Sequence, residues 1–599
     1  MGVRGALACL VFTLLLSLPE VNYRLSLHDT MLANARMNDA EPVKLTTTPI
    51  FPQIPRSQTS KDFQVLVTVE APPPAGQKGR VPIDLAVVVN VGGGSKARLD
   101  SVKKAVRFII WQLYDDDRLA VIGPSNTRLF GETATGFLDI RGGRGNAESS
   151  LEKLQPRTRD GQAQQTSGLK VAMKMLSELA ASTSTRASFI ILLTDTGESG
   201  SFSKVAGDLP VVHTIGLGAW HDPKALRSIA KESHGTYSFV FDDENADDAI
   251  AGAVAVCVSG VKAVAAVGTR LRLEAAAGSG VKIERVESGG YNYKSTAAID
   301  KTSGEITVGV LYSGEAKSFI VHLHVPAVPP TTSPSVFEGN CDKQHLLTAS
   351  FVVLTDEGDA SPSTSILSVQ RPVPDYNAVT AALLKVPVPV VMDHIAQFGV
   401  LELVTIFVEE EIWGLSSLTS ITAEMAAAMA TKLQTMWEEF VLARQFWTGL
   451  NLATFEVEIN YMVSHLVAAG SGGGSPVFVT AYIFSWQSSY QMQRPTAMGS
   501  PSSVAQTFVT LNVLLTVQQI TTFVTVAPGG CGDCLPCKDD CVEAQLPPVF
   551  VPSGGHGDTY DVNPAYPAEL LGVMIRASNV KQCDSSGVVE KQSLPRGLA

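Results

Sequence analysis

The folded pattern of the chain begins with a segment in which apolar residues occupy every second position. Phe63, Val65, Val67 and Val69 alternate with more polar neighbours in segment 62–70, which predicts a half-buried β-strand. The same period of two returns in segments 269–273, 305–310, 318–325, 348–355 and 364–369. Turns that contain glycine separate several of these later segments. Together they predict an antiparallel β-sandwich that includes the early strand.

Between the early strand and the rest of the sandwich, continuous apolar runs alternate with amphipathic segments. The run at 84–90 (DLAVVVN) is typical of a central strand of a parallel sheet, because such strands are buried on both faces. Further strands are predicted at 118–122, near 129–130, and at 189–194, 211–217 and 237–240, with helices at 99–113, 168–179, 223–231 and 246–258. This alternation predicts a parallel sheet covered by helices on both faces.

The following part of the chain is predicted to be helical up to about residue 525. Helices are expected at 394–411, 423–447 and 453–467, where apolar residues recur at helical spacing. The predicted fold class is a multidomain α/β protein, with a Rossmann-like domain inserted in or flanked by an antiparallel β-sandwich and followed by a helical domain. The expected divisions are 1–42 (leader or extension), 43–80 (first strands of the sandwich), 81–261 (α/β domain), 262–375 (sandwich), 385–525 (helical domain) and 526–599 (a largely irregular tail).

Composition and charge narrow the classes of function. A chain of 599 residues with 45% hydrophobic and 17% charged residues is expected to form several globular domains. The net charge of −12 argues against sequence-independent binding to nucleic acid, which needs a basic surface. After the N-terminus, no apolar run is judged long enough for a membrane span, so no integral span is expected in the mature chain.

The first 18 residues have the charge and length of a secretory signal peptide. Arg4 precedes the apolar run 6–18, although the small residues of a cleavage site are missing after it. Met31 and Met37 lie shortly before the first predicted strand and are alternative starts. The protein is predicted to be secreted if residues 1–18 act as a signal peptide, and cytoplasmic otherwise.

The loop at 90–95 (NVGGGS) is the first candidate for a functional site, because ligands of open α/β sheets bind at the carboxyl ends of the strands. Its glycines also fit a dinucleotide-binding fingerprint, in which Gly92, Gly94 and Ala97 follow a strand and open a helix. That fingerprint expects an acidic residue at the end of the second strand, where the sequence has none. Nucleotide binding therefore has little support.

Five segments of the chain, taken in order, resemble plant proteins in which a von Willebrand factor type A (vWA) domain precedes an intein-associated C-terminal domain (Vwaint). The segments are TTTPIFPQIPRSQTSKDFQVLVTVEAPP, the strand and loop at 84–95, DDRLAVI, HTIGLGAWHDPKALRSIAKESHGTYSFV and YIFSWQSSYQMQRPTAMGSP. The resemblance implies that the Rossmann-like unit is a vWA domain, which usually binds a divalent metal and a protein ligand at the rim of its sheet. Some relatives resemble ubiquitin ligases through an N-terminal RING zinc finger. No Cys/His array of that kind precedes residue 84 here, so ligase activity is not carried over.

The resemblance also indicates where a metal-dependent adhesion site would lie. The family supplies oxygen ligands from an Asp-x-Ser-x-Ser motif, a Thr and an Asp, and such ligands suit Mg²⁺. In this chain the motif begins with Asn90 and has Gly92 and Gly94 in place of the serines, while Thr166 and Asp195 match the other two loops. Ser95 lies one position beyond the motif. We expect a degenerate site whose rim includes Asn90, Gly92, Gly94, Ser95, Thr166 and Asp195, without bound Mg²⁺.

A cluster of four cysteines near the C-terminus is a second candidate site. Cys531, Cys534, Cys537 and Cys541 have the spacing that holds an iron–sulfur cluster in bacterial ferredoxins, although Val542 replaces the usual proline. Four thiolates also suit Zn²⁺ in tetrahedral geometry. In an oxidising compartment they could instead pair as disulfides, and an unoccupied loop is a further alternative. The spacing leaves these alternatives open.

Motifs of common hydrolases are absent, since the chain contains neither H-E-x-x-H nor G-x-S-x-G. We expect no enzyme activity and no resident cofactor. The preferred interpretation is a protein–protein interaction module that binds a protein partner at the carboxyl-edge loops of the vWA domain. One alternative is an adaptor or regulator in ubiquitin transfer, and another is metal or iron–sulfur binding through the C-terminal cysteines.

Overall fold

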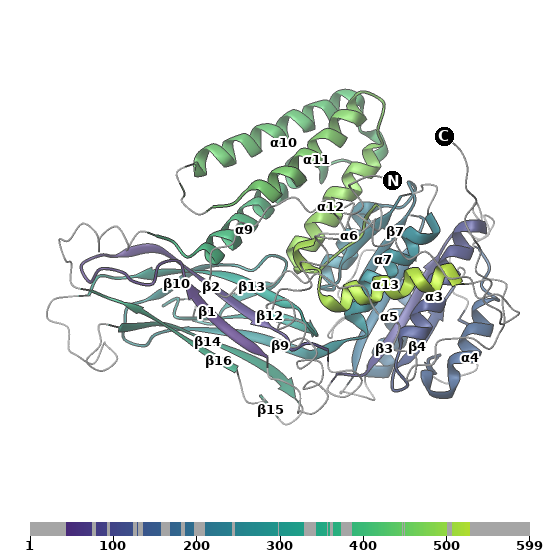
Figure 1. The fold of residues 1–599 in the computed structure, drawn as a ribbon, viewed down its shortest axis with the longest axis horizontal. Coiled ribbons are helices and arrows are strands. Elements are labelled where there is room, and N and C mark those ends of the chain that lie inside the picture. The colour runs from purple at the N-terminus through teal and green to yellow at the C-terminus, as the bar shows by residue number, and fades with distance from the viewer. Residues whose placement is uncertain are drawn as a thin grey trace, which may run out of the picture.

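In the computed structural model, the described residues form a β-sandwich, an α/β sheet with its helices, and a group of helices that lies above both (Figure 1). They are residues 43–74, 80–92, 96–123, 128–129, 136–156, 168–180, 186–196, 210–241, 246–297, 299–328, 343–355, 358–359, 363–372, 386–445, 447, 450–499 and 506–526. The predicted fold class is confirmed.

Two antiparallel sheets make the sandwich. One has the order β1-β2-β13-β10, and the other has the order β11-β12-β9-β14-β15, with β16 also paired to β14. The strands are β1 Lys44–Pro49, β2 Ser60–Glu70, β9 Val264–Ala275, β10 Lys282–Glu287, β11 Asn292–Ser295, β12 Ser303–Tyr312, β13 Ala316–Val325, β14 Lys343–Thr355, β15 Gly358–Asp359 and β16 Ser363–Gln370. Because β2 precedes the α/β unit in the chain and pairs with β13, which follows it, the α/β unit is inserted into the sandwich.

The α/β unit is built on a seven-stranded sheet of order β17-β8-β7-β6-β3-β4-β5, in which only β5 is antiparallel to its neighbour. Its strands are β3 Ile83–Asn90, β4 Arg118–Ile122, β5 Leu138–Asp139, β6 Ala187–Thr194, β7 Val211–Leu217, β8 Tyr237–Val240 and β17 Met498–Gly499. Its helices are α3 Lys96–Gln112, α4 Ile140–Leu151, α5 Gly168–Ala180, α6 Pro223–Glu232 and α7 Ala246–Val261.

Strand β3 has an apolar layer on each of its faces. Leu85, Val87 and Val89 belong to the core that includes α3 and α7. Ala86 and Val88 belong to the core that includes α5 and α6. Because both faces of the strand are covered by helices, all five residues from 85 to 89 are apolar, which explains the unbroken apolar run in the sequence.

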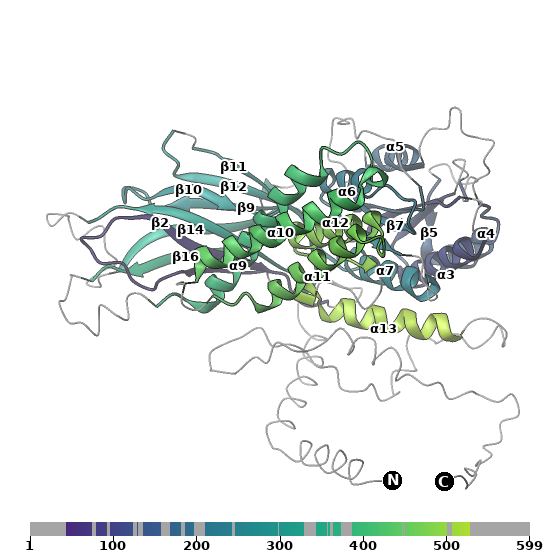
Figure 2. The same cartoon turned by 90° about the horizontal axis from the view of Figure 1, so that it is seen from above.

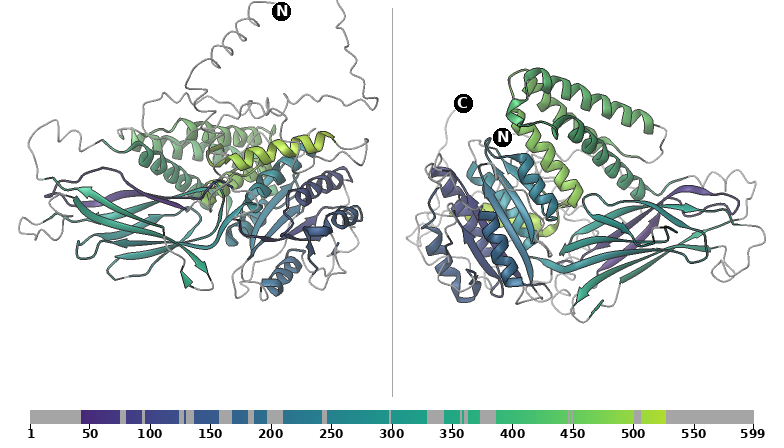
Figure 3. Two further views of the ribbon diagram at one scale, coloured as in Figure 1. Left: turned by 60° about the horizontal axis from the view of Figure 1, so that its bottom comes forward. Right: turned by 180° about the vertical axis from the view of Figure 1, so that it is seen from behind.

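The helical group consists of α9 Pro389–Phe407, a π-helical turn η4 Val408–Ile412, α10 Ala423–Arg444, α11 Ala453–Gly470, α12 Pro476–Met492 and α13 Leu511–Val526, with short 3₁₀ turns η5 Leu418–Ser420 and η6 Gln506–Phe508. Seen from behind, the α10–α11 hairpin lies above the sandwich and the α/β unit (Figure 3). Helix α13 runs along the outside of α3 and α7 (Figure 2), where Phe523 meets Phe108 with ring centroids 5.7 Å apart.

The sequence did not predict the helices α4, α12 and α13 or the short strands β10, β11, β15 and β17. Helix α12 is buried on nearly all sides, so its residues show no amphipathic period. Ser475 caps its first turn by accepting a hydrogen bond from the Phe478 N–H. The strand expected near 129–130 is wrong, since the structure has a single bridge at Arg128 there and forms the antiparallel strand at β5.

One described helical segment, Pro389–Ile412, is long and apolar enough to cross a membrane by the measures of length and composition. This differs from the expectation that no apolar run after the N-terminus is long enough to span a membrane. In the structure, 61% of its most apolar 18-residue window is buried inside the protein. This burial is typical of a core helix in a globular protein.

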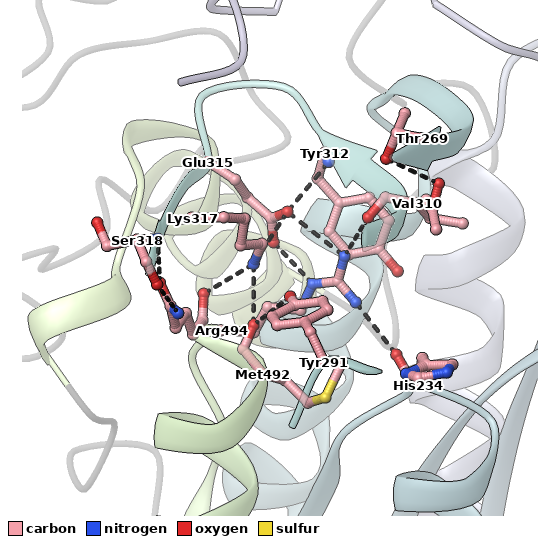
Figure 4. A network of polar contacts seen from close by, with 12 residues as sticks. His234, Thr269, Tyr291, Val310, Tyr312, Glu315, Lys317, Ser318, Met492 and Arg494 are labelled. Atoms are coloured by element: carbon pink, nitrogen blue, oxygen red, sulfur yellow. Dashed lines mark hydrogen bonds and ion pairs between the residues drawn. The ribbon is translucent and has the colours of Figure 1, made fainter. Parts of the chain in front are cut away.

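Arg494, just after α12, joins the three parts of the molecule through a buried polar network (Figure 4). Its guanidinium pairs with Glu315 at 2.8 Å and donates a hydrogen bond to the Val310 carbonyl at 2.8 Å, both in the sandwich. It also donates to the His234 carbonyl of the α/β unit at 3.3 Å. Lys317 extends the network, because its ammonium donates to the Met492 carbonyl and pairs with Glu315.

In this network, charge pairing changes the pKa values of Glu315 and Arg494 more than burial does. Burial alone would raise the pKa of Glu315, but Arg494 and Lys317 hold that pKa below its usual value. Burial alone would lower the pKa of Arg494, but Glu315 raises it. Both side chains are therefore charged, and each needs the other for compensation.

His213 on β7 is a buried neutral histidine, and it predicts a loss of stability in mild acid. Its Nδ1 accepts the Thr236 N–H at 3.2 Å, so the ring proton is on Nε2, which lies 2.9 Å from the Tyr312 hydroxyl. Burial, with a smaller effect of Arg494, lowers its pKa to about 3. Below pH 6.5 the unfolded chain takes up a proton that the folded chain refuses, so stability falls as the pH falls.

We expect His213→Gln to remove this part of the pH dependence. Between pH 6.5 and 5 the free energy of unfolding of the wild type should fall more steeply than that of the variant, by about 0.7 kcal/mol per pH unit at pH 6.5 and by about 1.4 kcal/mol per pH unit near pH 5. Urea unfolding at several pH values measures the two slopes. Parallel pH curves for the two proteins would show that His213 does not titrate as its burial requires.

Candidate functional site

The site predicted from the sequence lies where β3 and β6 end at the same edge of the sheet. The two strands pair in parallel, with Asn90 opposite Thr194. Asp195 follows directly, and its N–H donates to the Asn90 carbonyl at 3.3 Å. The Asn90 side-chain amide donates to the Thr196 hydroxyl at 3.2 Å. The structure therefore brings Asn90 and Asp195 together, as expected for parallel strands.

The Asp195 carboxylate is occupied by donors from its own chain. Both of its oxygens accept the Gly92 N–H, at 2.9 and 3.1 Å. The Arg98 guanidinium of α3 pairs with Oδ2 at 3.3 Å. Asp195 is only 7% exposed, so its charge is compensated within the protein by this cation and the backbone donor.

Asn90 and Asp195, the predicted rim residues with side-chain oxygens that the structure describes, do not by themselves form a cage for a hard divalent cation. Mg²⁺ requires several oxygen ligands in near-octahedral geometry, whereas the site described here has the Asp195 carboxylate and the Asn90 amide. Within the described part of the chain, no group of three or more His, Cys, Asp or Glu residues could hold a metal ion. A Cβ atom on Gly92 would lie 3.6 Å from Asp195 Oδ1, an ordinary contact. Packing alone thus does not require a glycine at this position of the motif.

The remaining predicted site residues lie outside the described residues. These are Gly94, Ser95 and Thr166 at the rim, and Cys531, Cys534, Cys537 and Cys541 near the C-terminus. Their roles stay predictions.

Sequence reasoning missed an exposed tryptophan at the same edge. Trp220 lies in the loop after β7 and is 81% exposed. Strand β7 is the second neighbour of β3 in the sheet, so the two strand ends are about 10 Å apart, at roughly 4.8 Å per strand. The sequence feature that could have identified Trp220 is a large aromatic residue in a short loop directly after a buried strand.

The loop that carries Trp220 is held rigidly. The neighbouring His221 is buried, and its ring nitrogens lie 2.6 Å from the Gly218 carbonyl and 2.7 Å from the Tyr237 hydroxyl. Burial lowers the pKa of His221 to about 4, so the ring is neutral at neutral pH. Asp222 then caps α6 by accepting the Lys224 and Ala225 N–H groups. The indole is thus presented by a loop that is anchored on both sides.

The α/β unit is a mostly parallel sheet covered by helices on both faces. Residues 83–239 match the family model of the von Willebrand factor type A domain. The chain therefore carries a vWA domain, a type of domain that binds proteins. Identification of the helical region as an intein-associated domain stays a prediction.

Among known proteins, the chain is similar to the E3 ubiquitin-protein ligase WAV3 of Arabidopsis thaliana, with 28% identity over 278 residues. The match covers 44% of this chain and 35% of that protein, so the chain spans about a third of the relative's length. Solved structures with a similar fold include a von Willebrand factor type A protein from Catenulispora acidiphila (TM-score 0.46, 14% identity, 72% of this chain and 90% of that one). Another is the ArnB paralog VWA2 from Sulfolobus acidocaldarius (TM-score 0.39, 13% identity, 74% and 99%).

Proposed function

We propose that this protein is a protein–protein interaction module that binds a protein partner at the carboxyl edge of its vWA sheet. The observation that carries the proposal is Trp220, which presents a largely exposed indole on an anchored loop at that edge. Tryptophan is enriched among residues that dominate binding energy at protein interfaces. A rigid aromatic group also loses little conformational entropy on binding.

Binding at this edge is proposed to be independent of metal. In metal-dependent sites a bound cation compensates the carboxylates of the loops, whereas here Arg98 compensates Asp195. A divalent cation placed beside Asp195 would have to displace the guanidinium and the Gly92 N–H. The partner would then be held by apolar contact with Trp220 and by hydrogen bonds to the rim.

We expect EDTA to leave partner binding unchanged. The full chain is immobilised, a partner is captured from a cell extract and purified, and its affinity is measured with EDTA and with added Mg²⁺. The two dissociation constants should agree within about twofold, because no cation takes part in the contact. A strong loss of binding in EDTA, restored by Mg²⁺, would contradict the metal-independent rim.

A second candidate function is that of an adaptor or regulator in ubiquitin transfer. Its support is the partial sequence similarity to the E3 ligase of Arabidopsis thaliana. Relatedness without a shared functional site is a weak argument for function. The test is an in vitro ubiquitination assay of the full chain, with and without zinc, alone and added to an active ligase. If no step of the assay changes, this candidate is removed.

Zn²⁺ or iron–sulfur binding by the C-terminal cysteines stays a separate proposal. It rests on the spacing of Cys531, Cys534, Cys537 and Cys541 alone. Elemental analysis and the visible spectrum of the purified chain decide between the two groups. A colourless protein without zinc or iron would end both.

A further inference from the structure

A cavity of about 500 Å³ lies where the three parts of the molecule meet, and it is distinct from the rim of the vWA sheet. Its walls include Arg227 and Lys231 of α6, Asn292 of the sandwich, Glu409 of η4 and Gln487 of α12. Its volume is within the range of sites that bind small molecules. Because all three parts contribute to its walls, the cavity exists only in the assembled fold.

Arg227 is a buried cation in the wall of this cavity. The side chain is 5% exposed, and its guanidinium carbon lies 5.6 Å from the ring centroid of Trp413 and 5.2 Å from that of Phe484. Arg227 makes no hydrogen bond or ion pair with another described residue, and its Nε is buried without a partner. Burial lowers its pKa to about 10, which still leaves it charged at neutral pH. A buried guanidinium without an acceptor is costly.

Other polar groups around the cavity are only partly satisfied, or form no ion pair, among the described residues. Gln487 is fully buried, and its Nε2 donates to the Thr405 hydroxyl at 3.1 Å while its Oε1 has no hydrogen-bond partner among the described residues. Lys231 stands at the exposed side, and its pKa is lowered by burial and then by the positive charge of Arg227. Glu409 raises the pKa of Arg227 through its charge but forms no ion pair with it in the described structure. Arg227 and Lys231 thus share the cavity wall with the carboxylates of Glu232 and Glu409, and neither cation forms an ion pair among the described residues.

The π-helical turn η4 shapes one wall of the cavity. A π-turn is a costly local geometry that often occurs at functional sites. Here it carries Glu409, and the Trp413 N–H that follows donates to the Val408 carbonyl at 2.8 Å. Trp413 lines the cavity and is 42% exposed, so its indole is accessible to a ligand.

We propose that this cavity binds a small anion through a carboxylate or phosphate group that accepts hydrogen bonds from Arg227 and is attracted by Lys231. The planar guanidinium matches the two oxygens of either group, and the resulting hydrogen bonds are charge-assisted. The cavity leaves room for a polar remainder beside Asn292 and Glu409. This inference does not depend on partner binding at the rim.

The test is isothermal titration of the full chain with inorganic phosphate and, separately, with succinate, against sodium chloride at the same ionic strength. At least one probe should bind saturably, and the stronger of the two assigns the group that Arg227 prefers. Arg227→Met keeps the apolar stem and should raise the dissociation constant at least tenfold, about 1.4 kcal/mol. Lys174→Met is the matched control, because Lys174 on α5 is 75% exposed and does not line the cavity. It should leave the dissociation constant unchanged.

Lys231→Met provides a second variant at an exposed position, so the test does not depend on the folding of Arg227→Met. It should weaken binding about threefold or more, because it removes one of the two cations. The proposal is overturned if neither probe binds saturably up to about 10 mM. It is equally overturned if the folded Arg227→Met protein, or failing that the Lys231→Met protein, binds as tightly as the wild type.

Discussion

Replacing Arg494 by methionine should lower the free energy of unfolding by about 3–5 kcal/mol, the usual cost of removing one partner from a buried ion pair. The methionine keeps apolar contact with Tyr312, over whose ring the guanidinium lies at 4.1 Å. What is lost is the cation that compensates the buried carboxylate of Glu315 and satisfies the Val310 carbonyl. Urea unfolding measures the change.

The matched control for this variant is Lys44→Met. Lys44 pairs with Glu70 at 2.9 Å, but both side chains are largely solvated, so its loss should cost less than about 1 kcal/mol. If Arg494→Met changes stability as little as Lys44→Met does, the network in Figure 4 does not hold the three parts together. Separate unfolding of the α/β unit and the sandwich in Arg494→Met would be further support, because Arg494 bonds to both.

Replacing Trp220 by alanine should weaken partner binding by at least about 2 kcal/mol, roughly thirtyfold, which is the effect of removing a binding hot spot. The indole is 81% exposed, so the change should leave stability nearly unaffected. The affinity of the captured partner for wild type and variant gives the result, with thermal unfolding as a check on the fold.

Trp447→Ala is the matched control for Trp220→Ala. Trp447 is also partly exposed, at 42%, but it follows α10 in the helical group and not a strand of the vWA sheet. The proposal requires partner binding to fall in Trp220→Ala and not in Trp447→Ala. Equal affinities for wild type and Trp220→Ala would move the interface away from this edge.

The sequence predicted the sandwich and the parallel sheet because both depend on burial patterns that are local in the chain. The period of two in β2 and the unbroken run of β3 each report how many faces of a strand are covered. Reading burial from local patterns did not identify α12. Ser485 and Ser488 on that helix bond to the backbone of β8, and Trp486 bonds to Glu458 of α11. Polar residues that satisfy partners far away in sequence do not leave a periodic signal.

At the predicted rim, too, some features follow from the sequence and others depend on the tertiary structure. Asn90 and Asp195 could be placed together from the sequence, because adjacent parallel strands end at one edge. That Arg98 pairs with Asp195 could not, since it depends on how the first turn of α3 lies over the strand end. The sequence shows that Trp220 lies in a loop, but it does not predict that the side chain is exposed. The alternation of strands and helices does not predict which loop residues are exposed to solvent.

The sequence by itself determined the three kinds of architecture in this protein. Through a family resemblance it also predicted a site at the carboxyl edge of the sheet, with Asn90 and glycines in place of the usual metal ligands. These follow from side-chain chemistry and from spacing along the chain. Only the tertiary structure decided that Arg98 compensates Asp195, that Arg494 joins three parts, and that Arg227 lines a cavity with its buried Nε unpaired. The physical reason is that the cost of a buried charge depends on its neighbours in space. These neighbours lie far away in the sequence, for example 97 residues for Arg98 and Asp195 and 179 residues for Arg494 and Glu315.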